Sequence, residues 1–351
     1  MDTLELFFWV IFVLLVIIII GIIILCYIKQ ATLFQPTRDE KWYPDLKKCE
    51  EHRSFMETIR DTDMELSKEQ HKTNKYCEDY VTKFNSLFLV IGDKNHKEYT
   101  KEEINKLKNS KITNLSELQY INIWKFENFL GKRIVLYFHG NNDNISYRKY
   151  VIDICNLLKL NLLLVDYRGY GESSGLPDSL SLLKDAKTTY KYITKHYNWN
   201  DVIIWGESLG GIAAIWTAHK YKANCLVLLS TFSDIKTVIK QLGVNPGVQN
   251  MIKKFANSKL MNNGKWIRDV KIPTVIMHSQ EDDILPYVNA KLNYDAVSAE
   301  KKKLITIQGQ HAHPFFTDKQ LYDLLHFIDI DDSEVLDHKN IEKVLNIINN
   351  L

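Results

Sequence analysis

The chain has 351 residues, a formal net charge of +2 and 45% hydrophobic residues. This length is enough for one α/β domain of about 200 to 250 residues with additional segments, and the near-neutral charge gives no sign of a nucleic-acid partner. Five cysteines without a CxxC pair do not make a disulfide framework. They fit thiols kept reduced on the cytosolic side of a membrane.

An uncharged apolar run occupies residues 6–28, and its 23 residues are enough to cross the hydrocarbon core of a bilayer. Asp2 and Glu5 precede the run and no small-residue cleavage site follows it, so it differs from a cleaved signal peptide. Basic residues follow the run but none precedes it. We therefore predict a single-pass transmembrane anchor over residues 1–28, with the rest of the chain on the cytoplasmic side.

Residues 29–117 carry few motifs. Their patterns predict a helix over 49–80, a strand over 84–91 and a short helix over 101–107. We interpret this region as a linker and lead-in to the domain that follows.

From residue 118 to residue 328 the pattern alternates between strands and helices, which is typical of a parallel sheet covered by helices. Strands are expected over 118–126, 134–138, 162–165, 201–205, 225–229, 273–278 and 303–307. Helices are expected over 177–196, 235–242 and 287–297. We predict an α/β fold with a mostly parallel central sheet, a small lid over 243–268 and a helical tail over 329–351.

The most informative stretch is Gly206-Glu207-Ser208-Leu209-Gly210, which joins a buried-type strand to a helix of small residues. Gly-x-Ser-x-Gly in this context forms a sharp turn that exposes the serine hydroxyl, and its glycines keep the turn free of Cβ clashes. The free N–H groups at the start of the helix favour a negative charge that develops beside the serine. Ser208 is therefore the predicted nucleophile.

A second loop, His139-Gly140-Asn141, follows the strand expected over 134–138. A glycine-containing loop at this place lets backbone N–H groups converge on a reacting carbonyl oxygen. We predict an oxyanion hole made by the N–H groups of Asn141 and Leu209.

Candidates for the acid and the base follow the strands expected over 225–229, 273–278 and 303–307. Asp282 is the preferred acid, with Asp283 and Asp234 as alternatives, and His311 is the preferred base, with His313 as the alternative. The two histidines could instead suggest a metal site, but no HExxH motif or acid–histidine cluster accompanies them. We expect neither a metal nor another cofactor.

The chain order Ser208, Asp282, His311 is that of the α/β-hydrolases. Four segments together resemble the membrane-anchored α/β-hydrolase domain-containing proteins, a family that includes enzymes removing palmitate from proteins: residues 136–141, 165–171, 206–211 and 279–286. The resemblance implies an α/β-hydrolase fold and the roles of nucleophile, acid and base at these three positions. Two departures are Ser279, where the family usually has glycine, and Ala312-His313 after the base, where it often has Asn-Asp.

These features predict a membrane-anchored serine hydrolase that cleaves a carboxylic ester or thioester, of a lipid or an acylated protein, through an acyl-enzyme. Two alternatives stay open. One is a peptidase or aminopeptidase that hydrolyses amides on the same fold, and the other is a non-catalytic membrane scaffold.

Overall fold

The computed structural model describes residues 34–39, 84–110, 118–127, 133–234 and 262–350, with a few single positions between them (44, 67, 70, 72, 73, 237 and 238). The predicted anchor and nearly all of the predicted helices over 49–80 and 235–242 lie outside these residues, as does most of the predicted lid. None of the helices in the described part is long and apolar enough to span a membrane.

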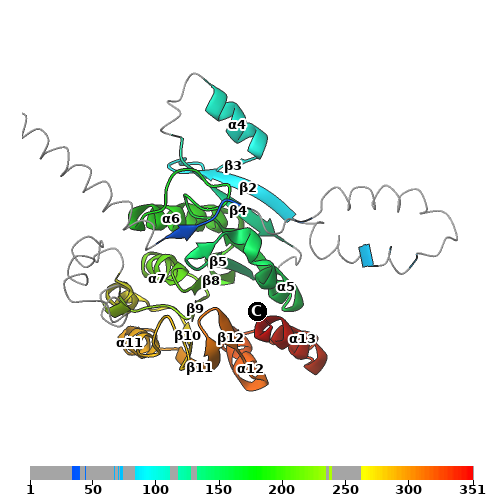
Figure 1. Ribbon diagram of the computed structural model, residues 1–351, viewed down its shortest axis with the longest axis vertical. Helices are drawn as coiled ribbons and strands as arrows, with labels where there is room; N and C mark the ends of the chain where they lie inside the picture. The colour runs from blue at the N-terminus through cyan, green and yellow to red at the C-terminus, as the bar shows by residue number, and fades with distance from the viewer. Residues whose placement is uncertain are drawn as a thin grey trace, which may run out of the picture.

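One large sheet forms the centre of the molecule (Figure 1). Within the described residues it has ten strands in the order β12-β11-β10-β9-β8-β5-β7-β4-β2-β3. In chain order they are β2 (Phe84–Val90), β3 (Glu98–Tyr99), β4 (Tyr120–Phe126), β5 (Ile134–Phe138), β7 (Asn161–Val165), β8 (Val202–Glu207), β9 (Cys225–Leu229), β10 (Thr274–Ser279), β11 (Lys302–Gln310) and β12 (His313–Phe315). The α/β architecture with a mostly parallel sheet is confirmed, because the strands from β7 to β11 along this order run parallel to one another.

The sheet reverses its order at β5, which lies between β7 and β8. Loops that leave the carboxyl ends of the parallel strands meet at one edge of the sheet, and a reversal of strand order opens a crevice there. We call this edge the carboxyl edge. It is where β5 and β8 present the two loops singled out in the sequence.

Helices cover both faces of the sheet (Figure 1). One face packs against α6 (Ser179–His196), α7 (Gly210–Lys220) and α11 (Val288–Ala296). The other packs against α5 (Lys149–Leu157), α12 (Asp318–Phe327) and α13 (His338–Asn349). Residues of β5 alternate between these two cores, with Leu136 in the first and Val135 in the second, as the two-residue period of a strand requires.

The structure adds elements that the sequence patterns did not predict. Among them is β3, which pairs with β2 at the end of the same sheet, whereas β2 itself is the strand predicted over 84–91. α5, α12 and the short strand β12 were also not expected, and α4 (Lys101–Asn109) extends slightly beyond the predicted helix. The tail predicted to be helical over 329–351 forms α13 from His338 to Asn349, and its Ile341, Val344 and Leu345 are buried in the second core.

A small second sheet ties the start of the described chain to the domain. β1 (Gln35–Pro36) pairs in parallel with β6 (Asn142–Asp143), which directly follows the loop after β5. We call residues 34–39 the N-terminal strap.

Candidate active site

The turn between β8 and α7 holds Ser208 in a strained backbone conformation. Its φ is +50°, a left-handed value that is uncommon for residues other than glycine. The Ser208 N–H donates to the Leu229 carbonyl at 2.9 Å, and the Thr231 hydroxyl donates to the Ser208 carbonyl at 2.7 Å. These contacts hold the strained turn in place, which is the geometry of an exposed nucleophile between a strand and a helix.

The glycines of the motif are required by close packing around this turn. A Cβ on Gly206 would lie 2.6 Å from the Ala214 Cβ, and a Cβ on Gly210 would lie 2.0 Å from the Phe138 carbonyl oxygen. The start of α7 therefore packs directly against the end of β5. This contact brings the serine turn next to the loop that follows β5.

Three predicted side chains meet at the carboxyl edge of the sheet. Ser208 Oγ lies 3.0 Å from His311 Nε2, and His311 Nδ1 lies 2.8 Å from Asp282 Oδ2. They come from three different strand ends, since Asp282 follows β10 and His311 lies in the turn between β11 and β12. The histidine ring is 13% exposed, whereas the aspartate carboxylate is fully buried.

The Asp282 carboxylate is held on both of its oxygens. Oδ1 accepts the N–H groups of Ile284 at 3.0 Å and Leu285 at 2.6 Å, while Oδ2 faces His311 and also lies 3.2 Å from His278 Nε2. Burial alone would raise the pKa of Asp282, but the hydrogen bonds from both histidines, the charge of His311 and the Leu285 N–H hold this pKa well below its usual range. The carboxylate is therefore ionised and fixed in orientation.

The alternative acids have different contacts. Asp283 accepts the His311 backbone N–H at 3.1 Å, and so supports the base loop without facing the imidazole. Asp234 accepts the backbone N–H of Thr237 at 2.9 Å and also its hydroxyl. The alternative base, His313, lies on β12 opposite Gln310. Of the candidates, it is Asp282 and His311 that the structure brings together with the serine.

The loop predicted to form the oxyanion hole lies against the serine turn. The position of a Cβ on Gly140 is 3.6 Å from the Ser208 Cβ. The Tyr170 hydroxyl donates to the Asn141 carbonyl at 2.9 Å and fixes the end of this loop. On the other side of the serine, the Leu209 N–H donates to no acceptor among the described residues. Leu209 directly follows Ser208, and the loop that carries Asn141 lies against the serine turn.

The sequence matches the family Hydrolase_4, described as serine aminopeptidase S33, over residues 131–266. Protein bem46 of Schizosaccharomyces pombe is 29% identical over 175 residues, which cover 48% of this chain and 58% of that protein. An uncharacterized membrane protein of Saccharomyces cerevisiae, YNL320W, is 25% identical over 201 residues, which cover 54% of this chain and 68% of that one. The chain thus spans between about half and two thirds of these relatives.

A solved structure of the esterase Pf2001 from Pyrococcus furiosus superposes with a TM-score of 0.51 and 14% identity, over 89% of this chain and 98% of that one. This structural similarity shows that the two proteins share a fold. The chain has the α/β-hydrolase fold, and its sequence is similar to members of that family. The family resemblance drawn from the sequence motifs is confirmed.

The sequence reasoning did not identify a second carboxylate, which lies directly beside Ser208. Glu207 accepts hydrogen bonds from the hydroxyls of Tyr137 and Tyr150, the latter at 2.9 Å, and its Oε2 lies 3.9 Å from Arg148 Nε. Burial alone would raise the pKa of Glu207, but the Arg148 charge and the two hydroxyls outweigh it, and the pKa is lowered. An acidic residue at the end of an apolar strand was the signal that could have revealed this network.

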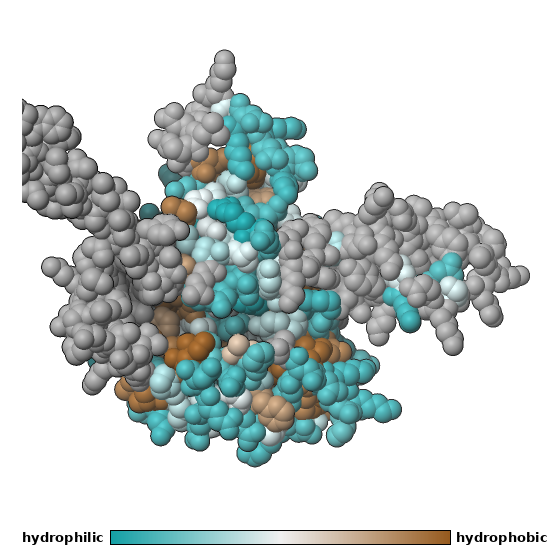
Figure 2. Space-filling model, viewed as in Figure 1, coloured by the Kyte–Doolittle hydropathy of each residue, from teal (hydrophilic) through white to brown (hydrophobic). Residues whose placement is uncertain are grey.

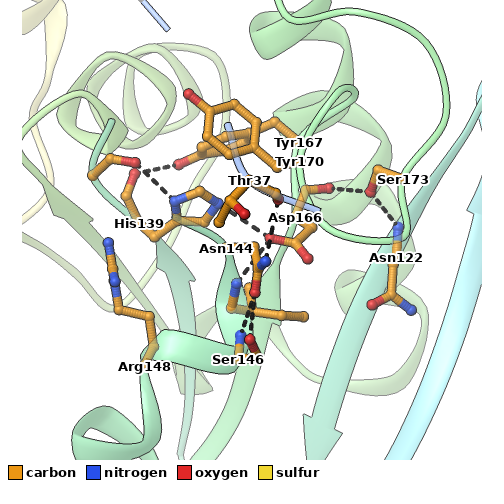
Figure 3. Close-up of polar contacts among 12 residues, drawn as sticks. Thr37, Asn122, His139, Asn144, Ser146, Arg148, Asp166, Tyr167, Tyr170 and Ser173 are labelled. Atoms are coloured by element: carbon orange, nitrogen blue, oxygen red, sulfur yellow. Dashed lines mark hydrogen bonds and ion pairs between the residues drawn. The ribbon is translucent and has the colours of Figure 1, made fainter. Parts of the chain in front are cut away.

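The loop after β7 supports the loop after β5 (Figure 3). Asp166 accepts the Ile145 N–H at 2.9 Å, and its Oδ1 lies 3.4 Å from His139 Nε2. Arg168 donates to the Asp185 carboxylate at 2.7 Å. Asp166 and Arg168 thus support this part of the chain.

The N-terminal strap contacts the chain segments that follow β6 and β7. Figure 3 shows Thr37 beside Asn144, whose side-chain amide donates to the Thr37 carbonyl at 3.2 Å. The Gly171 N–H donates to the same carbonyl at 2.9 Å. Phe34, at the start of the strap, is buried in the first core. Sequence patterns could not reveal this contact because β1 and β6 have two residues each and are far apart in the chain.

Within the described part of the chain, no group of three or more His, Cys, Asp or Glu side chains is arranged to hold a metal ion.

Proposed function

We propose that this α/β-hydrolase is a serine hydrolase that cleaves carboxylic esters or thioesters through an acyl-enzyme. The observation that carries the proposal is the continuous contact from Ser208 Oγ to His311 Nε2 at 3.0 Å and from His311 Nδ1 to Asp282 Oδ2 at 2.8 Å. A serine hydroxyl is a weak nucleophile unless a base within hydrogen-bond reach takes its proton. These distances are within that reach.

In the proposed mechanism, His311 takes the Ser208 proton as the hydroxyl oxygen attacks the substrate carbonyl carbon. Asp282 keeps the imidazole in the required tautomer and stabilises the positive charge that it gains. The N–H groups of Asn141 and Leu209 stabilise the negative charge on the carbonyl oxygen. His311 then returns its proton to the leaving group, and a water molecule attacks the acyl-serine by the same route to release the acid.

We also propose that residues 6–28 anchor the hydrolase as a single-pass membrane protein, with the catalytic domain on the cytoplasmic side. The length and uniformity of the apolar run support this, as does the similarity to a yeast protein named as a membrane protein. An enzyme held at a bilayer meets acyl chains at high local concentration. Esters of lipids and thioesters of acylated proteins are therefore the proposed substrates.

Fluorophosphonate labelling of membranes that contain the full chain tests the proposal. We expect wild type and His313→Ala to label, and Ser208→Ala and His311→Ala not to label, since only the latter two remove the nucleophile or its base. Absence of labelling in folded wild type would favour a non-catalytic scaffold. Labelling that survives His311→Ala but not His313→Ala would move the base to His313.

An amide hydrolase is the second candidate, and the printed description of the matching family as serine aminopeptidase favours it. The same acyl-enzyme chemistry cleaves both bond types. A panel of acyl thioesters, lysolipids and aminoacyl amides distinguishes them. Higher kcat/KM for the amides would replace the ester proposal while leaving the roles of the three side chains unchanged.

A further inference from the structure

The N-terminal strap fixes where the chain leaves the domain toward residue 28. Phe34 is 4% exposed and is packed in the core. Arg38 at the other end of the strap donates to the carbonyls of Ser173 at 3.2 Å and Gly175 at 3.3 Å, in the loop after β7. β1 pairs with β6, which directly follows the loop after β5. The strap is therefore attached to the carboxyl edge of the sheet, which also carries Ser208.

The short distance along the chain from the apolar run to the strap limits how the domain can be oriented relative to the bilayer. Five residues separate position 28 from Phe34, and even when fully extended the six Cα–Cα steps between these two positions span only about 20 Å. A domain of this size is about 40 Å across. With residues 6–28 in a bilayer, the carboxyl edge is held near the headgroups and the opposite edge of the sheet points away from them.

Exposed apolar side chains gather on the same side of the molecule. Seven large hydrophobic side chains are exposed among the described residues, and five of them lie on loops or at element ends of the carboxyl edge: Leu176, Leu180, Ile284, Val288 and Phe315. Leu292 is on the next turn of α11, and brown patches mark the α11 region in Figure 2. The seventh, Trp199, precedes β8 and lies at the opposite edge. Exposed apolar clusters of this kind mark surfaces that meet a membrane or a protein.

We propose that the carboxyl edge of the sheet rests on the bilayer surface, with Leu176 and Val288 inserted among the lipids on two sides of the site. Leu176, 70% exposed, is next to Gly175, which accepts a hydrogen bond from the strap. Val288 begins α11, directly after the loop that carries Asp282. An acyl chain then reaches Ser208 from the leaflet without crossing water. This last step rests on the proposed esterase or thioesterase function, whereas the docking rests on the proposed membrane anchor at residues 6–28.

Depth-dependent quenching tests the docking on the full chain in phosphatidylcholine nanodiscs. Cys26, Cys49 and Cys77 are replaced by serine, and single cysteines at Leu176, Val288 or the control position Trp199 carry the fluorophore NBD. Cys155 and Cys225 are buried and stay in place.

A lipid with a doxyl group near its headgroup quenches probes that lie within the outer part of the leaflet, about 5–10 Å deep for an apolar face of this kind. We expect strong quenching at positions 176 and 288 and none at position 199. Equal quenching at all three positions, or none at any of them, would overturn the docking. Protection of 176 and 288 from aqueous iodide without doxyl quenching would also overturn it, and would assign the face to another protein.

Measurement of kcat/KM gives an independent test of the docking. The double variant Leu176→Lys/Val288→Lys is expected to lower kcat/KM for a long-chain acyl ester dissolved in the nanodisc by about tenfold or more, the factor that loss of one buried aliphatic side chain can give. Its kcat/KM for water-soluble p-nitrophenyl acetate should match wild type. Equal loss on both substrates would contradict the docking.

Fluorophosphonate labelling of wild type is measured in the same nanodiscs. Labelled protein without doxyl quenching rejects the docking and keeps the hydrolase. Quenched protein that neither labels nor turns over an ester rejects the proposed function and keeps the docking.

Discussion

Replacement of Asp282 by asparagine is the sharpest test of the proposed mechanism. Its Oδ2 lies 2.8 Å from His311 Nδ1, while Oδ1 accepts two backbone N–H groups. An asparagine whose oxygen keeps the backbone contacts presents its NH₂ group to the imidazole, so Nδ1 must accept and the ring proton moves to Nε2. That tautomer cannot take the proton of Ser208.

We expect Asp282→Asn to lower kcat about 10⁴-fold, the order of loss found when such an acid is replaced in a serine protease, which corresponds to about 5 kcal/mol in the activation free energy. KM should change little, because the carboxylate does not contact substrate. Asp283→Asn is the matched control. Its amide oxygen can still accept the His311 N–H, now at 3.1 Å from Oδ1, so we expect a loss of less than about tenfold.

The assay combines kcat for p-nitrophenyl butyrate, the rate of fluorophosphonate labelling, and thermal unfolding as a check of folding. Retention of kcat within tenfold in folded Asp282→Asn would refute the reasoning. So would an equal loss in Asp283→Asn or in Asp234→Asn.

The lowered pKa of Asp282 adds a prediction about stability. Because the folded pKa lies below the unfolded value near 3.9, the carboxylate stabilises the fold at every pH above that value, and this contribution is lost as the pH falls through the folded pKa. The difference in unfolding free energy between wild type and Asp282→Asn should therefore be constant from about pH 5 to pH 8 and shrink below about pH 4. Urea titrations at each pH measure it, and a difference that instead grows in acid would contradict the assigned contacts.

Three further predictions concern packing. Gly210→Ala places a Cβ 2.0 Å from a carbonyl oxygen at the end of β5 and should destabilise the fold by at least about 1–3 kcal/mol. The control is Gly264→Ala, whose Cβ has no packing neighbour nearer than 3.6 Å and which should change stability by less than about 1 kcal/mol. Urea unfolding compares the two variants. Ile341→Ala in α13 should cost about 2–5 kcal/mol, because the side chain is 1% exposed in the second core, and an unchanged urea midpoint would show that the tail is dispensable. Burial raises the pKa of the Cys155 and Cys225 thiols to about 12, so iodoacetamide at pH 8 should leave both unmodified in the folded protein and modify both in urea, as mass spectrometry can read.

Much of the parallel sheet could be predicted because its strands are continuous apolar runs. The strands β5, β7, β8, β9 and β10 are buried on both faces over most of their length, so none of them shows the alternation of polar and apolar residues that a half-exposed strand has. The strand β12 was missed for the opposite reason. It has three residues, two of them exposed, and it exists only because its backbone pairs with the end of β11.

One part of the candidate site could likewise be predicted from local sequence, and another part could not. The serine turn could be found locally, since a left-handed Ser208 needs glycine neighbours that are visible in the sequence. The choice among Asp234, Asp282 and Asp283 could not, because all three follow strands and only the turn geometry decides which carboxylate faces His311. Consecutive acids point in different directions: Asp282 turns inward to the imidazole, and Asp283 accepts a backbone N–H of the base loop.

The sequence by itself determined the fold class, the nucleophile turn and the chain order of the three candidate side chains. These depend on local hydrophobic period and on residues whose backbone needs are specific, such as the glycines around Ser208. The tertiary structure alone decided which acid and which histidine meet the serine. It also decided how Arg148 and two tyrosine hydroxyls stabilise the charged Glu207 carboxylate, and where the N-terminal strap attaches. Those features depend on contacts between residues that are from 29 to 137 positions apart in the chain, and such contacts are fixed by how the strands are ordered in the sheet.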